Sequence, residues 1–252
     1  MEIFSLKEKV AVVTGGNRGL GRTFALSLAK MGADVVVIGR DEVNNLSVIK
    51  EIESYGRRAM SLAVDLQDVT AIKSMVETIK NEFGKIDILV NNAGVSTTNF
   101  ALDVEEEEWN KVMDLNVRSL FFCSQVIAKE MKEQKSGKII NIASVVGAVG
   151  DVGISPYTAS KAAVINLTRS LALEWARFGI QVNAIGPAYI ETEMNSDELS
   201  NPRVREKIIN KTPMKRLGKA EELEGALLLL ASDASSFITG QTIFVDGGWL
   251  AQ

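Results

Sequence analysis

The chain has 252 residues, of which 46% are hydrophobic and 24% are charged, a composition that excludes disordered and fibrous classes. Its formal net charge of -4 argues against nucleic acid or a membrane surface as a partner, because both attract clustered lysine and arginine. The chain has no histidine, so Ser-His and Cys-His catalysis and histidine-based metal sites are excluded, and we expect no metal.

Two features of the chain predict a cytoplasmic protein. Cys123 is the single cysteine and cannot form an intrachain disulfide, so nothing indicates an oxidising compartment. No apolar run reaches the roughly 18 to 20 residues that span a bilayer, and residues 1–9 mix charged and apolar side chains unlike a signal peptide. We therefore expect neither export nor a membrane anchor.

Short apolar runs that are typical of buried strands alternate along the chain with longer stretches of helical apolar spacing. The predicted strands are residues 10–13, 35–38, 59–64, 86–90, 138–142, 181–184 and 242–245, and the predicted helices include residues 20–31, 69–83, 109–131 and 157–178. This alternation predicts one α/β domain over residues 1–252, with a doubly wound parallel sheet of about seven strands and helices on both faces. Residues 188–217 are polar and fall outside this rhythm, so we expect a mostly helical lid there.

A glycine-rich turn follows the first predicted strand and opens the first long helix. Residues 14–21 read Thr-Gly-Gly-Asn-Arg-Gly-Leu-Gly, with the spacing G-x-x-x-G-x-G. Glycines permit a tight turn and a close approach of the backbone to a pyrophosphate, whose charge is stabilised at the positive N-terminus of the helix. The turn is therefore a candidate dinucleotide site, and the alternative is an ordinary connection between a strand and a helix.

Polar residues recur after the later strands. Residues 91–94, Asn-Asn-Ala-Gly, follow the fourth strand, Asn116 lies in the next helix, Ser144 follows the fifth strand, and Tyr157 and Lys161 are four residues apart in a predicted helix. That spacing puts the phenol and the amine on one face, although such a pair alone is also typical of a solvated surface. In a chain without histidine, a phenol can serve as acid and base if a neighbouring ammonium lowers its pKa of about 10.

In order and spacing, these motifs resemble those of the short-chain dehydrogenase/reductase family, and residues 245–248, Val-Asp-Gly-Gly, resemble the family's C-terminal end. The resemblance implies a single Rossmann-like domain and an NAD(P)-dependent enzyme that transfers a hydride between nicotinamide and a carbonyl or secondary alcohol. It assigns Tyr157 as the acid/base, Lys161 to the phenolate and the nicotinamide ribose, and Ser144 to the substrate oxygen. Asn116 would hold a water that relays protons to Lys161.

The same resemblance implies which residues bind the cofactor. They come from the glycine turn, from the ends of the second, third, fourth and sixth strands and from the catalytic helix: Gly15, Asn17, Arg18, Leu20, Arg40, Asp65, Leu66, Asn92, Ala93, Gly94, Tyr157, Lys161, Ile190 and Thr192. The chain departs from the family where Gly186-Pro187-Ala188 replaces the usual Pro-Gly. This departure leaves open the backbone path beside the nicotinamide.

The end of the second strand indicates which dinucleotide is preferred. Gly39 stands where NAD-preferring relatives carry an acid that binds the adenosine ribose. Without that carboxylate, Arg40 and Arg18 could pair with a 2′-phosphate through charge-assisted bonds. We therefore expect NADP to be preferred, with NAD as a second cofactor. The alternative is that Arg40 faces solvent and Asp41 turns inward to bind the ribose.

Local resemblance within the family favours a sugar acid such as gluconate or a ketogluconate as substrate. Residues 3–6, 173–176 and 247–250 look like gluconate and deoxygluconate dehydrogenases, whereas residues 159–162 and 190–194 look like 3-oxoacyl-(acyl-carrier-protein) reductases, which are the alternative. An alternative of another class is a dinucleotide-binding regulator without catalysis, which would be expected to lack the tyrosine, lysine or serine.

Two further expectations concern specificity and assembly. Substrate specificity is expected to depend on residues 145–154 and 191–212, the first apolar apart from Asp151 and the second rich in cations. By resemblance, the helices over residues 109–131 and 157–178 form subunit contacts. We therefore expect a homo-oligomer, either a dimer or a homotetramer, with a small carbonyl or alcohol as its ligand.

Overall fold

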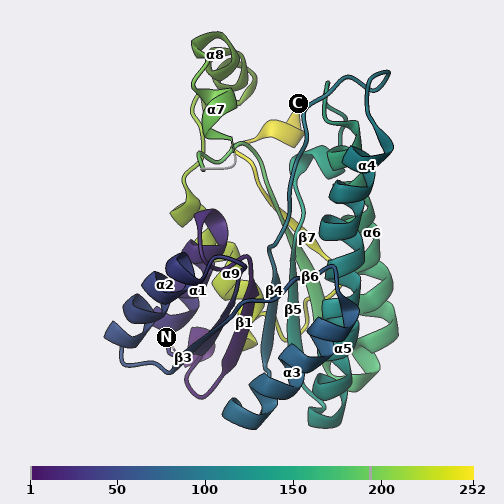
Figure 1. The fold of residues 1–252 in the computed structure, drawn as a ribbon. Helices are drawn as coiled ribbons and strands as arrows, with labels where there is room; N and C mark the ends of the chain where they lie inside the picture. The colour runs from purple at the N-terminus through teal and green to yellow at the C-terminus, as the bar shows by residue number, and fades with distance from the viewer. Residues whose placement is uncertain (1, 193–194) are drawn as a thin grey trace.

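Seven parallel strands form one sheet in the computed structural model, which describes residues 2–192 and 195–252 (Figure 1). Their order is β3-β2-β1-β4-β5-β6-β7. The strand order reverses between β1 and β4, which is where sheets of this kind bind ligands at the carboxyl ends of their strands. The predicted fold is confirmed. The strands are β1 Val10–Thr14, β2 Asp34–Ile38, β3 Ala59–Leu62, β4 Ile88–Asn91, β5 Gly137–Ile142, β6 Ile180–Pro187 and β7 Thr242–Val245.

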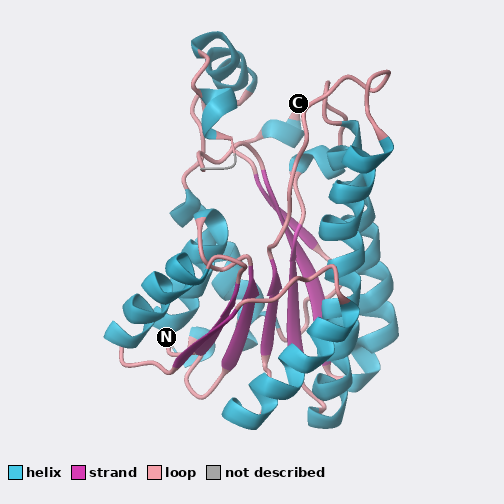
Figure 2. Ribbon diagram, in the orientation of Figure 1, coloured by secondary structure: helices cyan, strands magenta, loops and turns pink. Residues whose placement is uncertain are grey.

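Helices cover both faces of the sheet (Figures 1 and 2). One face carries α1 Gly19–Lys30, α2 Glu42–Ser54 and α9 Glu224–Ala231. The other face carries α3 Val69–Phe83, α5 Ser119–Gln134 and α6 Ser155–Trp175, and α4 Glu106–Met113 leads into α5 through a π-helical turn, Asp114–Arg118. The short helices α7 Ser196–Leu199 and α8 Pro202–Lys211 stand beyond the carboxyl ends of the strands, within the segment predicted as a lid.

Alternate side chains of the central strands enter two separate cores. Ala11 and Val13 of β1 join the core under α1, α2 and α9, whereas Val10 and Val12 join the core under α3 and α5. Successive residues of a strand point to opposite faces, and a strand covered on both faces is apolar throughout. Both faces of the sheet are therefore occupied by packing against helices, and polar groups can be placed at the carboxyl ends of its strands.

Short 3-10 helices complete the described chain. They are Glu2–Phe4, Val145–Gly147, Ala176–Phe178, Ala220–Leu223, Asp233–Ser235 and Trp249–Ala251. Glu193 and Met194, the last two residues of the stretch that resembles the reductases, lie outside the described residues. No helix within the described part of the chain combines the length and apolarity needed to cross a bilayer.

Candidate active site

The glycine turn after β1 is tied to the end of β4. The Thr14 hydroxyl donates to the carbonyl of Val90 at 3.3 Å and accepts from the backbone N–H groups of Asn92 and Ala93 at 3.0 and 3.1 Å. Asn92 Nδ2 in turn donates to the carbonyls of Thr14 and Gly15 at 3.0 and 3.1 Å. The two ends therefore form one rigid edge at the point where the strand order reverses.

Close backbone packing explains why this turn needs glycine. Gly15 has φ +61° and Gly19 has φ +49°, which are conformations that side chains rarely adopt. A Cβ on Gly21 would collide with the carbonyl of Gly15 and the side chain of Asn92. The first turn of α1 carries no acidic residue, and its N-cap, Arg18, makes no side-chain capping bond. The N–H groups at the positive end of α1 are thus free to bind a pyrophosphate.

Two positive charges and one negative charge near the end of β2 are relevant to the choice between NADP and NAD. Arg18 and Arg40 are both exposed, so neither guanidinium is buried against the protein. The Asp41 carboxylate caps α2, since it accepts from the backbone N–H of Asn44 at 3.1 Å and from its side-chain amide at 2.7 Å. Asp41 is therefore held by its own helix, whereas both arginines are available to a 2′-phosphate.

Asp65 and Leu66 follow β3. Asp65 accepts from the backbone N–H of Gln67 at 3.0 Å, which closes a tight turn, and Leu66 is 7% exposed and packs in the core under α3. Both residues were predicted to bind the cofactor, and they follow β3 at the carboxyl edge of the sheet, the edge that also carries the glycine turn after β1.

Tyr157, Lys161 and Ser144 meet at the carboxyl end of β5. Tyr157 and Lys161 lie one turn apart on α6, and the Lys161 Nζ is 5.4 Å from the centre of the Tyr157 ring. The Ser144 hydroxyl lies within reach of the Tyr157 phenol; it donates to the carbonyl of Pro187 at 3.4 Å and accepts from the N–H of Val146 at 3.3 Å. The Lys161 ammonium donates to the carbonyl of Ile142 at 2.7 Å. The structure therefore brings together the phenol, the hydroxyl and the amine that the sequence spacing predicted.

Asn116 supports this group from the π-helical turn. Its Nδ2 donates to the carbonyl of Val95 at 2.9 Å and to the Ser160 hydroxyl at 3.0 Å, and its Oδ1 accepts from the N–H of Val95 at 2.8 Å. A Cβ on Gly94 would lie 3.1 Å from Asn116 Oδ1 and 3.8 Å from Lys161 Nζ. Only glycine therefore leaves this approach to the Lys161 amine open, on the side where a ribose is expected.

Burial dominates the acid-base properties of the site. It raises the pKa of Tyr157 to about 12, against a smaller lowering by the hydrogen bond with Ser144, and it lowers the pKa of Lys161 to about 8. The expected lowering of the tyrosine pKa by lysine does not prevail, because desolvation penalises both charged forms and the Lys161 ammonium is bonded to a carbonyl. The phenol is consequently a proton donor near neutrality.

Beyond β6 the backbone continues in a regular way. Ala188 N donates to the carbonyl of Val245 at 3.2 Å, and Ile190 pairs with Gly218 in an isolated bridge. A Cβ on Gly186 would collide with the ring of Phe244, so the glycine that precedes Pro187 is required by packing against β7. Gly186-Pro187-Ala188, which replaces the usual Pro-Gly, thus leaves β6 unbroken as far as Pro187.

The loop that follows is fixed by side-chain bonds. Thr192 N and Oγ1 donate to Asn195 Oδ1 at 2.9 and 3.2 Å, and Asn195 Nδ2 donates to the carbonyl of Ile190 at 2.8 Å. Glu191 forms two bonds with the Arg205 guanidinium of α8 at 2.9 and 3.2 Å. Residues 190–192 are thereby connected to α8, and Ile190 and Thr192 lie on the same loop.

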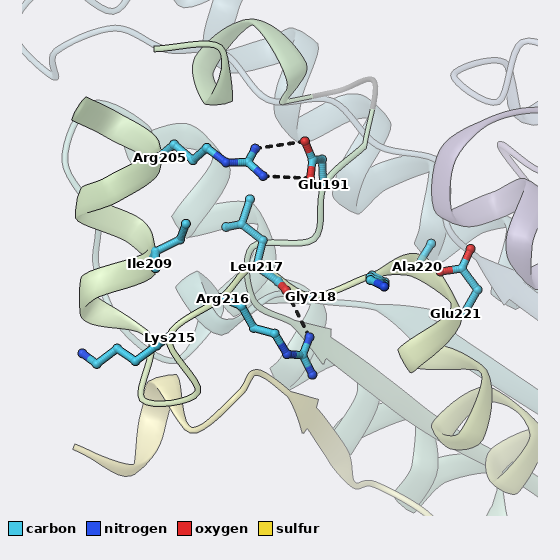
Figure 3. Close-up of a pocket in the computed structure, with 10 residues that line it drawn as sticks. Glu191, Arg205, Ile209, Lys215, Arg216, Leu217, Gly218, Ala220 and Glu221 are labelled. Carbon is cyan, nitrogen blue, oxygen red and sulfur yellow. Dashed lines mark hydrogen bonds and ion pairs between the residues drawn. The ribbon is translucent and has the colours of Figure 1, made fainter. Parts of the chain in front are cut away.

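A cavity of about 500 Å³ opens beside this loop (Figure 3). Figure 3 shows the Arg205–Glu191 pair on one wall and Arg216, which donates to the carbonyl of Leu217 at 3.1 Å, on another. Neither Tyr157 nor Ser144 lines this cavity. The cavity is therefore separate from the group formed by Tyr157, Lys161 and Ser144.

An apolar cluster with a polar rim surrounds Tyr157. Tyr157 packs in it with Tyr189 and Trp249, and α8 contributes Ile208. The Tyr189 hydroxyl donates to Asp151 at 2.8 Å, and the rings of Tyr189 and Trp249 are 5.3 Å apart. The sequence singled out Asp151 as the polar exception in its segment but gave no sign of Tyr189, since the contact joins two distant loops.

No metal site accompanies these groups. Within the described residues, no three or more Cys, Asp or Glu side chains gather in a way that could hold an ion. Among the described residues, the site combines a glycine turn at a helix N-terminus, two exposed guanidinium groups, a partly buried phenol and a buried amine. These groups fit a dinucleotide with an added phosphate and a substrate that exchanges one proton.

Comparison with known proteins covers nearly the whole chain. A family model described as enoyl-(acyl carrier protein) reductase matches residues 15–250. The chain is 43% identical over 254 aligned residues to the 2-dehydro-3-deoxy-D-gluconate 5-dehydrogenase of Dickeya dadantii, covering 100% of this chain and 99% of that one. It is 41% identical over 242 residues to the 3-oxoacyl-(acyl-carrier-protein) reductase of Staphylococcus aureus, covering 95% and 97%.

Solved structures give the same result. A gluconate 5-dehydrogenase from Burkholderia cenocepacia in complex with NADP and tartrate superposes with a TM-score of 0.97 and 36% identity, covering 100% of this chain and 98% of that chain. A short-chain type dehydrogenase/reductase from Mycobacterium marinum superposes with a TM-score of 0.95 and 36% identity, covering 100% and 99%.

Proposed function

This chain belongs to the short-chain dehydrogenase/reductase family and is an NAD(P)-dependent oxidoreductase, and we propose that it transfers a hydride between NADP and a sugar acid of the gluconate type. The substrate carries a secondary alcohol in one direction and the corresponding ketone in the other. The observation that carries the proposal is the contact of Tyr157 with Ser144, beside Lys161, at the edge that bears the glycine turn.

The residues divide the chemistry as follows. Bound NADP supplies the hydride for reduction of the ketone. Tyr157 donates its phenolic proton to the carbonyl oxygen, and the Ser144 hydroxyl donates a hydrogen bond to the same oxygen as negative charge develops there. Lys161 stabilises the phenolate that remains and binds the nicotinamide ribose. Asn116 fixes the loop beside Lys161 and holds a water that returns a proton toward Lys161.

NADP preference is supported by charge at the end of β2. Arg18 and Arg40 are exposed, residue 39 offers no carboxylate, and Asp41 is held by its own helix. A 2′-phosphate would gain charge-assisted bonds there and meet no repulsion. Dinucleotide contacts are assigned to the remaining residues along this edge, from the glycine turn to the loop after β6: Gly15, Asn17, Leu20, Asp65, Leu66, Asn92, Ala93, Gly94, Ile190 and Thr192.

A sugar acid is supported by the polar rim of the tyrosine cluster and by the relatives that act on gluconate compounds. Asp151 and Tyr189 can bond substrate hydroxyls, while the Lys211 ammonium lies 4.4 Å from the centre of the Trp249 ring in the same cluster and can pair with a carboxylate. The second candidate is a 3-oxoacyl-(acyl-carrier-protein) reductase, which the 41% identical relative favours.

A cytoplasmic homotetramer completes the proposal. Exposed apolar residues support assembly: Leu173 on α6 is 85% exposed, and Phe237, shortly before β7, is fully exposed. The loop that carries Phe237 continues to Gly240, where an added Cβ would lie 3.5 Å from the Ala172 side chain. The two apolar residues thus belong to neighbouring segments at one side of the sheet.

The test is an absorbance assay at 340 nm. Purified protein is mixed with NADPH or NADH and with ketogluconates, acetoacetyl thioesters or simple ketones. We expect NADPH oxidation with a ketogluconate, and a 10²- to 10⁴-fold lower turnover in Tyr157→Phe, because the general acid is lost. The matched control is Tyr55→Phe, an exposed tyrosine on the opposite face.

Other outcomes discriminate the alternatives. Turnover of the thioester alone would replace the sugar acid with the acyl substrate. Dinucleotide binding without turnover of any substrate would contradict an enzyme and favour a regulator. Equal turnover by Tyr157→Phe and the wild type would remove Tyr157 from the chemistry.

A further inference from the structure

Two asparagine side chains hold the turn at the end of β2. Asn45, near the N-terminus of α2, is 1% exposed, and its Nδ2 donates to the carbonyl oxygen of Gly39 at 2.8 Å. Asn17, in the glycine turn, is 9% exposed, and its Nδ2 reaches the carbonyl oxygen of Asp41 at 3.5 Å. The segment 39–41, which carries Arg40, is thus held by one amide from each of two elements.

The same amides fill the space over residue 39. A Cβ atom added to Gly39 would lie 2.5 Å from Asn17 Nδ2, 2.7 Å from Asn17 Cγ and 2.7 Å from Asn45 Oδ1. Carbon atoms in favourable contact are about 3.5 to 4.0 Å apart. A side chain therefore cannot be added at position 39 unless both amides move.

The two amides differ in their freedom to move. The 3.5 Å bond of Asn17 is at the limit of hydrogen bonding, so its amide can swing aside at little cost. Asn45 is almost fully buried and firmly bonded to the backbone that it covers. Asn45 is therefore the fixed wall of this space.

Asn45 also carries an unusual feature. Its Oδ1 is buried and has no hydrogen-bond partner among the described residues. Buried polar atoms are nearly always paired, and an unpaired one destabilises the fold. The bond to Gly39 accounts for the amide's Nδ2, but no contact among the described residues accounts for its buried Oδ1.

We propose that Asn45 is a specificity-determining positioning residue for the dinucleotide, an inference that rests on the NADP preference proposed above. Its amide holds the 39–41 turn so that Arg40 faces a 2′-phosphate. Its Oδ1 occupies the space that a ribose-binding carboxylate at position 39 needs. The arginines therefore attract the 2′-phosphate, while Asn45 prevents position 39 from accommodating the acid by which related enzymes bind NAD.

The test measures binding of adenosine 2′,5′-bisphosphate and of 5′-AMP to the full chain by titration calorimetry. The variants are Gly39→Asp, Asn45→Ala and the two combined. Gly39→Asp alone is expected to lose at least 10-fold in affinity for the bisphosphate and to gain less than 3-fold for AMP. Adding Asn45→Ala to it is expected to tighten AMP binding at least 10-fold, because the carboxylate then fits.

The matched control is Asn44→Ala in the Gly39→Asp background. Asn44 is the exposed neighbour, and its amide bonds Asp41 at 2.7 Å without touching residue 39. The affinity of this double variant for AMP is expected to stay within 2-fold of that of Gly39→Asp alone. Gly39→Asp binding AMP as tightly alone as it does with Asn45→Ala, or equal rescue by Asn44→Ala, would overturn the role of Asn45.

The single variant Asn45→Ala keeps the test decisive if the combined variant does not fold. Its affinity for the bisphosphate is expected to fall at least 5-fold, with AMP binding and kcat at saturating NADP within 2-fold of the wild type. Equal losses for both ligands would leave Asn45 a structural residue and overturn the inference. A wild type that binds AMP as tightly as the bisphosphate would instead contradict the NADP preference itself.

Discussion

Lys161 is the residue whose charge is most sensitive to pH near neutrality. Burial lowers the pKa of Lys161 to about 8 and raises the pKa of Tyr157 to about 12, so between these values the phenol stays protonated while the amine loses its charge. A neutral amine no longer stabilises the phenolate that forms when Tyr157 gives up its proton. The pH range in which both groups are in the active form is therefore below about 8.

We expect kcat/KM for ketone reduction to be level below pH 7 and to fall as the pH rises through about 8, because the ammonium is present below the pKa of Lys161 and lost above it. The measurement is a pH series with NADPH and the best ketone, checked for stability at each pH by circular dichroism. The guanidinium of Lys161→Arg stays charged, so the kcat/KM that remains in this variant is expected to fall only at a higher pH than that of the wild type. A level wild-type profile up to pH 10 would contradict the assigned role of Lys161.

Lys211 provides a test of the substrate at the same scale. Its ammonium lies over the Trp249 ring, and loss of a charge-assisted bond to a substrate carboxylate is expected to raise KM for a ketogluconate about 10-fold or more in Lys211→Met. The kcat value and the KM for an uncharged ketone are expected to change less than 2-fold. Lys207→Met, on the same helix, is the control. Equal effects on both substrates would remove Lys211 from carboxylate binding.

The residues proposed as catalytic could be singled out individually, because their spacing along single elements is visible in the sequence. Tyr157 and Lys161 share one helix face, and Ser144 follows a strand directly. Contacts between side chains and other parts of the chain could not be predicted. The Asn45 amide folds back onto the Gly39 carbonyl across the turn after β2, and Tyr189 meets Asp151 from a distant loop.

At the scale of elements, the glycine turn makes the sharpest stability and binding prediction. A methyl group on Gly21 would collide with the Gly15 carbonyl and with Asn92, so Gly21→Ala is expected to lower Tm by several degrees and to weaken dinucleotide binding at least 10-fold. Gly225→Ala, in α9, is the control, since its Cβ meets nothing within 4 Å and alanine favours a helix by about 0.5 to 1 kcal/mol. Thermal melts with and without NADP measure both effects. Unchanged NADP binding in Gly21→Ala would contradict the assigned role of the glycine turn.

Two elements differ from their sequence-based predictions for identifiable reasons. Residues 109–131 were predicted as one helix, but a π-helical turn at Asp114–Arg118 separates α4 from α5 and carries Asn116. Apolar spacing continues through such a turn, and only the tertiary contacts of Asn116 favour it. Helix α2 was not predicted, because Val43 and Leu46 are exposed and blur its apolar period.

At the scale of the whole molecule, the fold was predictable because strands covered on both faces leave continuous apolar runs. The order of the strands follows from short right-handed connections rather than from any one residue. What the sequence could not place is the loop and helix pair beyond β6, because Leu199 and Ile208 of this segment pack in an apolar cluster with Val145 and Trp249, which are distant in the sequence.

Assembly is the prediction that belongs to this scale. Leu173 is 85% exposed, and we expect Leu173→Glu to shift a tetramer to smaller species, because a buried charge without a partner opposes association. Light scattering after size exclusion measures the mass of each variant. Val43→Glu, an equally apolar exposed position on α2 at the other face, is expected to leave the mass unchanged. A wild-type monomer, or a tetramer in Leu173→Glu, would contradict an interface at α6.

The reversal of strand order between β1 and β4 divides the chain as well as the sheet. Nearly every group assigned to the adenosine and pyrophosphate lies before residue 95, and nearly every group assigned to the reacting carbon and the substrate lies after it. Changes in the later half can alter which alcohol is oxidised without disturbing dinucleotide selection. Related enzymes with this arrangement can therefore acquire new substrates by substitutions in the later half of the chain while they continue to use the same dinucleotide.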